Sequence, residues 1–297
     1  MKIAVVGSIN MDMTVSAPRI PLKGETILGE SLAYASGGKG ANQAVAMARQ
    51  GCDVWMFGCV GDDANGQLLL TGLEKNGVHT EHIRTVKNIS SGLAVITVGE
   101  HDNSIVVIPG ANKLVDVAYI QQMLPVLLTF DAVVLQLEIP LGTVEFVVES
   151  CYAHDIPVFL NPAPAAAISQ ELVDKVAYLI PNAHEAQLIF PEELSPEALV
   201  AKYPEKLIIT LGSQGCLACL SDGRLLKIPA AKVRPVDTTG AGDTFHGVFA
   251  VRRMMGDRLA DALLFANYAA GISTQQHGAQ DGMPTEAQVR QCMHESS

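Results

Sequence analysis

The sequence predicts an α/β fold, a three-layer α/β/α domain with a central, mostly parallel sheet and a small β-sheet lid. Two observations predict it. Short apolar runs of strand length alternate with amphipathic helical segments, which is typical of a parallel sheet covered by helices. Segments 13–36 and 91–109 instead show short alternating strands broken by turns. We expect these two segments to form a discontinuous lid within one domain spanning 1–297.

The composition is that of an ordinary globular chain. Of its 297 residues, 48% are hydrophobic and 17% are charged. The formal net charge of −11 argues against a nucleic acid or an anionic membrane as partner, because both need a basic surface. The first residues run directly into a strand pattern, and no apolar run approaches the ~20 residues of a membrane span. We therefore expect a cytoplasmic protein.

The six cysteines are scattered through apolar sequence and read as reduced core residues. Cys216 and Cys219 form a C-x-x-C pair, but the pair lies in a predicted strand. Residues three apart on a strand point to opposite faces, so we expect no metal or redox role for it.

The chain opens on a buried strand over residues 2–7, an apolar run bounded by glycine. In an open α/β sheet, polar residues just beyond the carboxyl end of a strand line the ligand crevice. Asn10 and Asp12 follow this strand, and both can hydrogen-bond to sugar hydroxyls. The alternative is a turn stabilised by short polar side chains.

A first glycine-rich motif, Gly-Gly-Lys-Gly-Ala-Asn-Gln-Ala over residues 37–44, opens a helical pattern. Lys39 can neutralise a phosphate or bind a hydroxyl, and Asn42 can bind a second hydroxyl. A solvated lysine at a helix start is the alternative. The motif lacks the spacing of a Walker loop, so the binding of phosphates is expected from a later motif.

The middle of the chain alternates helices and buried strands. Polar residues again follow the strands, namely Glu138, Asn161, Asn182 and the segment 210–213. Since the carboxyl ends of parallel strands meet at one edge of a sheet, these residues indicate a crevice there. The expected helices include 66–75 and 115–128, and the expected strands include 132–137, 158–160, 179–180 and 207–211.

The second glycine-rich motif, Gly240-Ala241-Gly242, precedes Asp243 and an apolar face at helical spacing. Unpaired N–H groups at such a helix start form an anion hole, which the helix dipole strengthens. Asp243 at its edge can take a proton from an attacking hydroxyl while the N–H groups hold a phosphoryl group. The alternative is a simple capping aspartate.

Together, motifs 37–44 and 236–245 resemble the signature pair of the ribokinase-like (PfkB) family of carbohydrate kinases, and the resemblance extends over nearly the whole chain. Within the family the chain is most similar to the kinases of ribose. The resemblance implies a ribokinase-like fold and an ATP-dependent kinase that phosphorylates the terminal hydroxymethyl of a pentose, D-ribose in the first place. Asp243 is then the general base, and residues 240–242 form the anion hole.

The resemblance also implies the ligand contacts. Those expected for the sugar are Asn10, Asp12, Gly38, Lys39, Asn42, Glu138 and Asp243. Those expected for the nucleotide are Asn182, Thr210, Gly212, Ser213, Gly215, Gly242 and Asn267.

Two cations are implied as well. Glu185 completes the family's N-x-x-E motif with Asn182 and is expected to hold Mg²⁺ through water, which agrees with the preference of Mg²⁺ for oxygen ligands. A monovalent cation, K⁺, is expected beside Asp237, Thr239 and a carbonyl of the C-terminal turn such as that of Thr274.

The lid is expected to exclude water, so that phosphate passes to the sugar and not to solvent. In the ribose kinases of this family the lid also forms a dimer contact, so the resemblance implies a homodimer. The alternatives are a kinase of deoxyribose, of a nucleoside or of another sugar, and a catalytically idle sugar-sensing protein on the same fold. The amide of Asn10 favours a sugar with a 2-hydroxyl, the 5% aromatic content gives little sign of a nucleoside site, and the intact Asp243 argues against a pure sensor.

Overall fold

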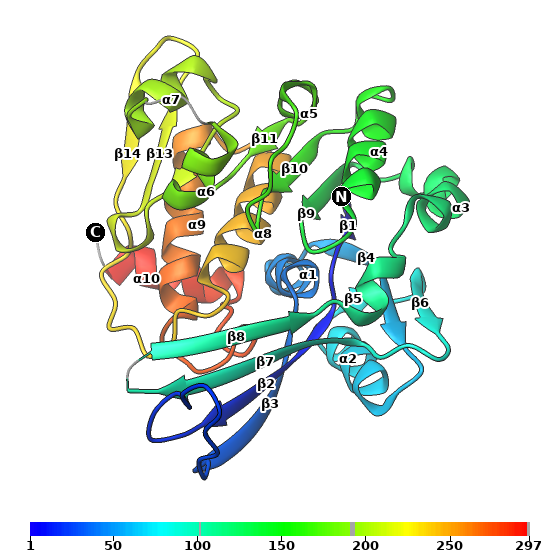
Figure 1. Cartoon of the computed structure of the whole chain (residues 1–297). Coiled ribbons are helices and arrows are strands. Elements are labelled where there is room, and N and C mark those ends of the chain that lie inside the picture. Colours follow the sequence, from blue (N-terminus) through cyan, green and yellow to red (C-terminus); the bar gives the residue numbers. More distant parts are fainter. Residues whose placement is uncertain (101, 191–193, 296–297) are drawn as a thin grey trace.

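The computed structural model describes residues 1–100, 102–190 and 194–295. Its central sheet is parallel throughout, with helices on both faces (Figure 1). From one edge to the other the strands are β11 (Tyr178–Leu179), β10 (Val158–Asn161), β9 (Ala132–Gln136), β1 (Lys2–Val6), β4 (Asp53–Gly61) and β5 (Val78–His79), and β6 (Ile83–Val86) also pairs with β4. The predicted mostly parallel sheet is confirmed.

Alternate residues of the central strands enter two separate cores. In β1, Ile3 and Val5 face one core and Ala4 and Val6 the other, so a strand buried on both faces reads as a continuous apolar run. The first core takes α1 (Lys39–Arg49), α2 (Ala64–Lys75), α8 (Ala241–Met254), α9 (Leu259–Ser273) and α10 (Glu286–Glu295). The second takes α3 (Val117–Leu127), α4 (Leu141–Tyr152), α5 (Gln170–Lys175), α6 (Ala183–Ile189) and α7 (Pro196–Lys202).

Beyond β11 the chain adds an antiparallel sheet of β12 (Ile209–Thr210), β13 (Cys216–Cys219) and β14 (Leu225–Ile228). Two parallel bridges, Leu179 to Leu207 and Asn182 to Thr210, join it to the central sheet. Strand 207–211 is therefore shorter than expected, and the 3₁₀ turn η2 (Gly212–Gln214) follows it. Cys216 and Cys219 enter opposite cores as free thiols, as predicted.

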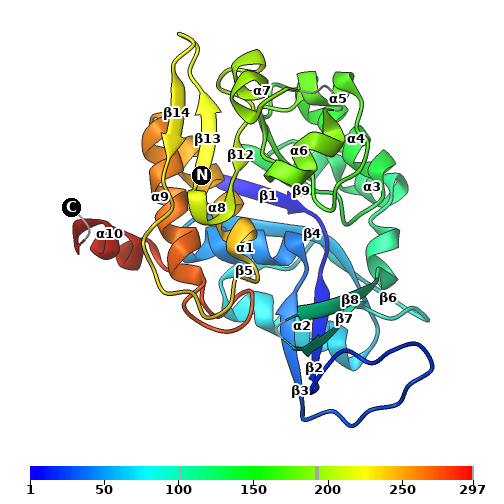
Figure 2. The same cartoon turned by 60° about the vertical axis from the view of Figure 1, so that its left-hand side comes forward.

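A second, four-stranded sheet projects from this body (Figure 2). Its order is β3 (Ser31–Gly37), β2 (Asn10–Ser16), β7 (Gly92–Gly99) and β8 (Asp102–Ile108), and only the β2–β7 pair is parallel. β2 begins at residue 10, three residues before the expected segment, because its ladder continues to Gly37 and Gly92. Asn10 and Asp12 thus lie on a strand of the small sheet, not in a turn. His101, in the expected β7–β8 turn, lies outside the described residues.

The 3₁₀ helix η1 (Gly110–Leu114) leads from β8 back into the main body. Within the described ranges, no helix is both long and apolar enough to cross a membrane.

Candidate active site

The turn before α8 has the backbone that the glycine motif predicts. Gly240 is left-handed, with φ of 76°, and a Cβ there would lie 2.7 Å from the carbonyl oxygen of Ala279. A Cβ on Gly242 would meet nothing within 4 Å. Gly240 is thus required by the turn itself, whereas Gly242 faces open space at the N-terminus of α8.

Two contacts decide which N–H groups of this turn can bind an anion. Ala241 N donates to Thr238 O at 3.2 Å, and Thr244 N donates to Gly240 O at 2.8 Å. In the described part of the chain, the N–H groups of Gly240, Gly242 and Asp243 have no acceptor. Of the three N–H groups expected to form an anion hole, that of Ala241 is used to close the turn, and those of Gly240 and Gly242 remain available.

Asp243 is 6% exposed, and its carboxylate is held by two side-chain amides of α1. Asn42 Nδ2 donates to its Oδ2 at 2.9 Å, and Gln43 Nε2 donates to its Oδ1 at 3.1 Å. An aspartate that only capped its helix would bond to backbone N–H groups of that helix. Here the side chain instead accepts from two residues of the first glycine-rich motif.

Both amides are themselves held by buried glutamines. Gln136 Nε2 donates to Gln43 Oε1 at 2.7 Å, and Gln280 Nε2 donates to Asn42 Oδ1 at 3.0 Å. Because the Asp243 carboxylate only accepts, the NH₂ end of each amide faces it, and the glutamines bind the carbonyl ends that remain. Gln43, Gln136 and Gln280 were not among the residues predicted for the site, although one signal in the sequence points to Gln136. Gln136 is a polar residue inside an apolar strand, and buried polar groups need partners.

Lys39 and Glu138 meet beside Asp243. The backbone N–H of Lys39 and the hydroxyl of Ser8 both donate to Oε2 of Glu138. The charge of Asp243 raises the pKa of Lys39 against the opposing effect of burial, and Glu138 and Glu185 add to the rise. The negative charges of three carboxylates thus favour the charged form of the lysine.

The pKa of Asp12 is also altered by the site. Burial, followed by the negative charges of Glu138 and Asp243, raises its pKa to about 7. The predicted sugar residues Asp12, Lys39, Asn42 and Glu138 thus lie in one electrostatic cluster around Asp243.

Three cavities follow one another along the carboxyl edge of the sheet. The largest, about 620 Å³, runs from Thr210 to Gly242 and Thr274. A smaller one, about 130 Å³, also touches Thr210 and Gly242, and it is lined by Lys39, Asn161, Asn182, Glu185, Asp243 and His246. The third, about 430 Å³, lies under β8 and includes Asn10, Asn112 and Glu138. Asp243 therefore stands in the small central cavity.

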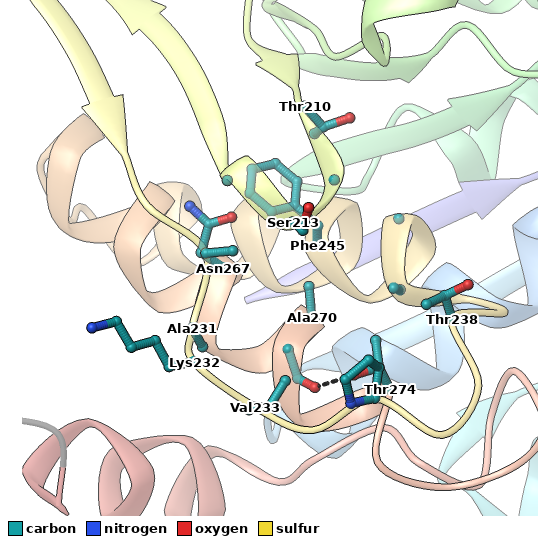
Figure 3. Close-up of a pocket in the computed structure, with 17 residues that line it drawn as sticks. Thr210, Ser213, Ala231, Lys232, Val233, Thr238, Phe245, Asn267, Ala270 and Thr274 are labelled. Carbon is teal, nitrogen blue, oxygen red and sulfur yellow. Dashed lines mark hydrogen bonds between the residues drawn. The ribbon is translucent and has the colours of Figure 1, made fainter.

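The largest cavity contains the predicted nucleotide residues Thr210, Gly212, Ser213, Gly215, Gly242 and Asn267. Figure 3 shows its side chains converging from η2, from segment 230–238, from α8 and from α9. Asn267 is anchored there, since its Nδ2 lies 3.3 Å from both Cys216 Sγ and Ile228 O. Most of the lining is apolar and includes Phe245, which fits the flat apolar surface of a nucleobase.

Asn182 and Glu185 form a reciprocal capping box at the start of α6. Asn182 Oδ1 accepts from Glu185 N, and Glu185 Oε2 accepts from Asn182 N, each at 2.8 Å. The helix start is thus rigid, and both residues still line the central cavity. An amide and a carboxylate at that place supply the oxygen donors that Mg²⁺ prefers.

His246 lies one turn into α8 and is buried behind the glycine turn. Its Nδ1 lies 2.6 Å from Gly242 O and its Nε2 lies 2.7 Å from Ile180 O. Burial, opposed by these two contacts, lowers the pKa of the ring. The histidine links the glycine turn to the end of β11, a role that the sequence did not indicate.

The three residues expected at the monovalent cation are brought together. Asp237 accepts from Thr239 N and from Gly278 N, and Thr274 O accepts from the N–H groups of Val236 and Asp237. Because two N–H groups occupy the carbonyl of Thr274, that oxygen is a weaker candidate than Asp237. Within the described residues, no group of three or more His, Cys, Asp and Glu could hold a metal ion.

Comparison with known proteins matches residues 1–286 to the pfkB family carbohydrate kinase model. The chain is 48% identical to the ribokinase of Bacillus subtilis over 98% of its own length and 99% of that protein. A crystal structure of Thermotoga maritima ribokinase is 33% identical, with a TM-score of 0.89, and the match covers 98% of this chain and 99% of that one. Arabidopsis thaliana ribokinase complexed with ribose and ATP is 31% identical, also with a TM-score of 0.89, with 98% of both chains covered.

Proposed function

The chain belongs to the pfkB family of carbohydrate kinases, and from this membership we propose that it transfers the terminal phosphoryl group of ATP to the terminal hydroxymethyl of a pentose, D-ribose in the first place. The observation that carries the proposal is Asp243, held by two amides in the small cavity that lies beside unpaired N–H groups. The similar Arabidopsis protein, whose structure contains ribose and ATP, supports both ligands.

The reaction follows from this placement. Asp243 takes the proton of the hydroxymethyl group while its oxygen attacks the terminal phosphorus of ATP. The bond between that phosphorus and the bridging oxygen breaks, and ADP leaves. The N–H groups of Gly240, Gly242 and Asp243 and the Lys39 ammonium stabilise the charge on the transferred group. The sugar is oriented by Asn10, Asp12, Gly38 and Glu138, and Asn42 acts through its bond to Asp243.

Two cations belong to the proposal. Asn182 and Glu185 would hold Mg²⁺, which when bound neutralises the triphosphate. Asp237 and the backbone around Thr239 would hold K⁺, with the remaining oxygens drawn from the C-terminal turn. The carboxylate of Asp237 supports this, because hydrogen bonds from Thr239 and Gly278 lower its pKa against the effect of burial and keep it ionised.

We further propose that the small sheet acts as a lid and as a dimer surface. β8 borders the cavity of about 430 Å³, called the sugar-side cavity below, through Val107. The sheet also exposes large apolar side chains, which favour association with a second copy. They are Leu32, Tyr34, Val98, Ile105, Val106, Val107 and Ile108.

ATP consumption by the purified protein tests the function. D-Ribose, 2-deoxy-D-ribose, fructose, adenosine and pseudouridine are compared with Mg²⁺, with and without K⁺, and after chelation of Mg²⁺. We expect turnover with ribose that needs Mg²⁺ and rises with K⁺. Turnover with another member of the panel alone would contradict the ribose assignment, and the absence of turnover with all of them would contradict a kinase of these substrates.

A further inference from the structure

We propose that Asn112 is a positioning residue for sugar selectivity. It fixes the side-chain amide of Asn10 so that the NH₂ group, and not the carbonyl oxygen, faces the sugar-side cavity. This inference rests on the proposed function and extends it to a residue of η1, outside both glycine-rich motifs.

The orientation of Asn112 is set by the main chain. Ile9 N donates to Asn112 Oδ1 at 2.9 Å, and a backbone N–H can only donate. The Nδ2 end of Asn112 must therefore point the other way, where it lies 2.7 Å from Asn10 Oδ1 and 3.3 Å from Ile9 O. Both asparagines are buried, at 1% and 3% exposure. A reversed amide at either position would bring two donors or two acceptors together.

The bond to Asn112 decides what Asn10 offers a ligand. Its Oδ1 already accepts from Asn112 Nδ2, and within the described residues its Nδ2 has no acceptor. Asn10 and Asn112 both line the cavity of about 430 Å³. The donor of Asn10 is thus the group left for the sugar.

Gly92 on β7 leaves the space that this bond needs. It pairs with Asn10 across the two strands. A Cβ on Gly92 would lie 2.1 Å from Asn10 Oδ1 and 2.3 Å from Asn112 Nδ2. Only glycine at position 92 therefore leaves room for the hydrogen bond between the two asparagines.

Selectivity follows from the number of protons on a hydroxyl. Asp12 lies two residues after Asn10 on β2, on the same face of the strand. A hydroxyl that donates its single proton to the Asp12 carboxylate must accept from a donor on its other side, and Asn10 Nδ2 is that donor. A 2-deoxy sugar leaves the donor without an acceptor. With the amide reversed, the hydroxyl would face two acceptors with one proton.

Asn112→Asp tests the inference, assayed at pH 8 so that the new carboxyl is ionised. One carboxylate oxygen keeps the Ile9 N–H, and the other repels Asn10 Oδ1, so the Asn10 amide turns and presents its oxygen to the cavity. We expect kcat/KM for D-ribose to fall by a factor on the order of 10 to 100, mainly through KM. For 2-deoxy-D-ribose we expect a change within about twofold. Asn112→Ala leaves the Asn10 amide free to take either orientation, so it should lower the preference for ribose less than Asn112→Asp does.

An equal fall for both sugars would overturn the inference, because Asn112 would then only support the fold. An unchanged ratio in both variants would overturn it as well. Wild-type protein that does not phosphorylate ribose would contradict the proposed function instead.

If the wild-type protein does not phosphorylate ribose, the role of Asn112 can still be tested without sugar. Hydrogen exchange of the side-chain NH₂ groups of Asn10 and Asn112 is then followed by NMR. We expect the NH₂ protons of Asn112 to be protected and those of Asn10 to exchange rapidly. Protection of Asn10 and rapid exchange of Asn112 would contradict the orientation.

Discussion

Gln43 donates its side-chain amide to the carboxylate of Asp243, 200 residues further along the chain, at 3.1 Å. Each residue belongs to a different glycine-rich motif, and each motif opens a helix, α1 and α8, that packs into the same core. The bond joins the proposed sugar side of the site to the proposed phosphate side. It also leaves the proposed base little rotational freedom, which is what a proton transfer in a defined geometry needs.

Gln43→Met removes this bond while keeping the length of the side chain. It also leaves the amide of Gln136 without its partner. We expect a fall in kcat of roughly 10-fold to 100-fold, with little change in KM for ribose, because the base is misplaced but the sugar contacts remain. The free energy of unfolding should fall by about 1–3 kcal/mol. Steady-state kinetics and urea unfolding measure the two effects.

Gln50→Met is the matched control. Gln50 is equally buried at the end of the same helix, and its Nε2 donates to Pro284 O at 2.7 Å, away from the cavities. We expect a similar loss of stability with kcat unchanged. If both variants lost kcat equally, the Gln43 bond would have no particular role in catalysis.

Lys39→Met removes the cation among Asp243, Glu138 and Glu185. The variant loses a donor to the transferred group and leaves three carboxylates without their counter-charge. We expect kcat/KM for ribose to fall by a factor on the order of 10². Lys75→Met, in the exposed last turn of α2, is the control and should behave as wild type. Wild-type kinetics for Lys39→Met would remove the lysine from the site.

His246→Leu leaves the carbonyl oxygens of Gly242 and Ile180 without their imidazole contacts. We expect a stability loss of about 1–3 kcal/mol, together with a lower kcat, since the glycine turn loses its support from β11. His184→Leu, at an exposed position nearby, should change neither quantity. Thermal unfolding and kinetics at saturating ATP distinguish these outcomes, and a stable, fully active His246→Leu protein would contradict the role given to the ring.

The titration of Asp12 makes the stability of the protein depend on pH. Its pKa is raised from 3.8 to about 7 by burial and by the charges of Glu138 and Asp243. Between these two values the unfolded chain has lost the proton that the folded protein keeps, so this group lowers stability as pH rises from about 4 to 7. Asp12→Asn removes the effect. We expect the variant, relative to wild type, to gain on the order of 2 kcal/mol in unfolding free energy between pH 5 and pH 8.

Urea unfolding at the two pH values measures this gain. A difference between variant and wild type that stays constant with pH would show that Asp12 titrates near its ordinary value in the folded protein.

The sequence predicted the layers, the sheet and the place of the site, because each depends on local pattern. An apolar run such as 2–7 and a glycine pair before Asp243 are visible over a few residues. The partners of Asp243 are not visible in this way. Gln136 reaches Gln43 over 93 residues and Gln280 reaches Asn42 over 238, and only the packed fold brings them together.

Local pattern also misled in two places. The local pattern places Asn10 and Asp12 just beyond a strand, but they continue as β2, where Asn10 pairs with Gly37 and Gly92 and Asp12 pairs with alanines of β3 and β7. Ala241 looks like part of an anion hole, but its N–H closes the turn on Thr238. In both cases a long-range pairing or a turn geometry decides what the side chain or N–H group can do.

Asp243 is the proposed general base, and the proposed function depends on it. Asp243→Asn tests it, with kcat measured by ADP release and ribose affinity measured by calorimetry on the same preparation. We predict a fall in kcat by a factor on the order of 10² or more, with ribose affinity changed only a few-fold, as expected when a general base is lost. Turnover close to that of the wild type would contradict the account.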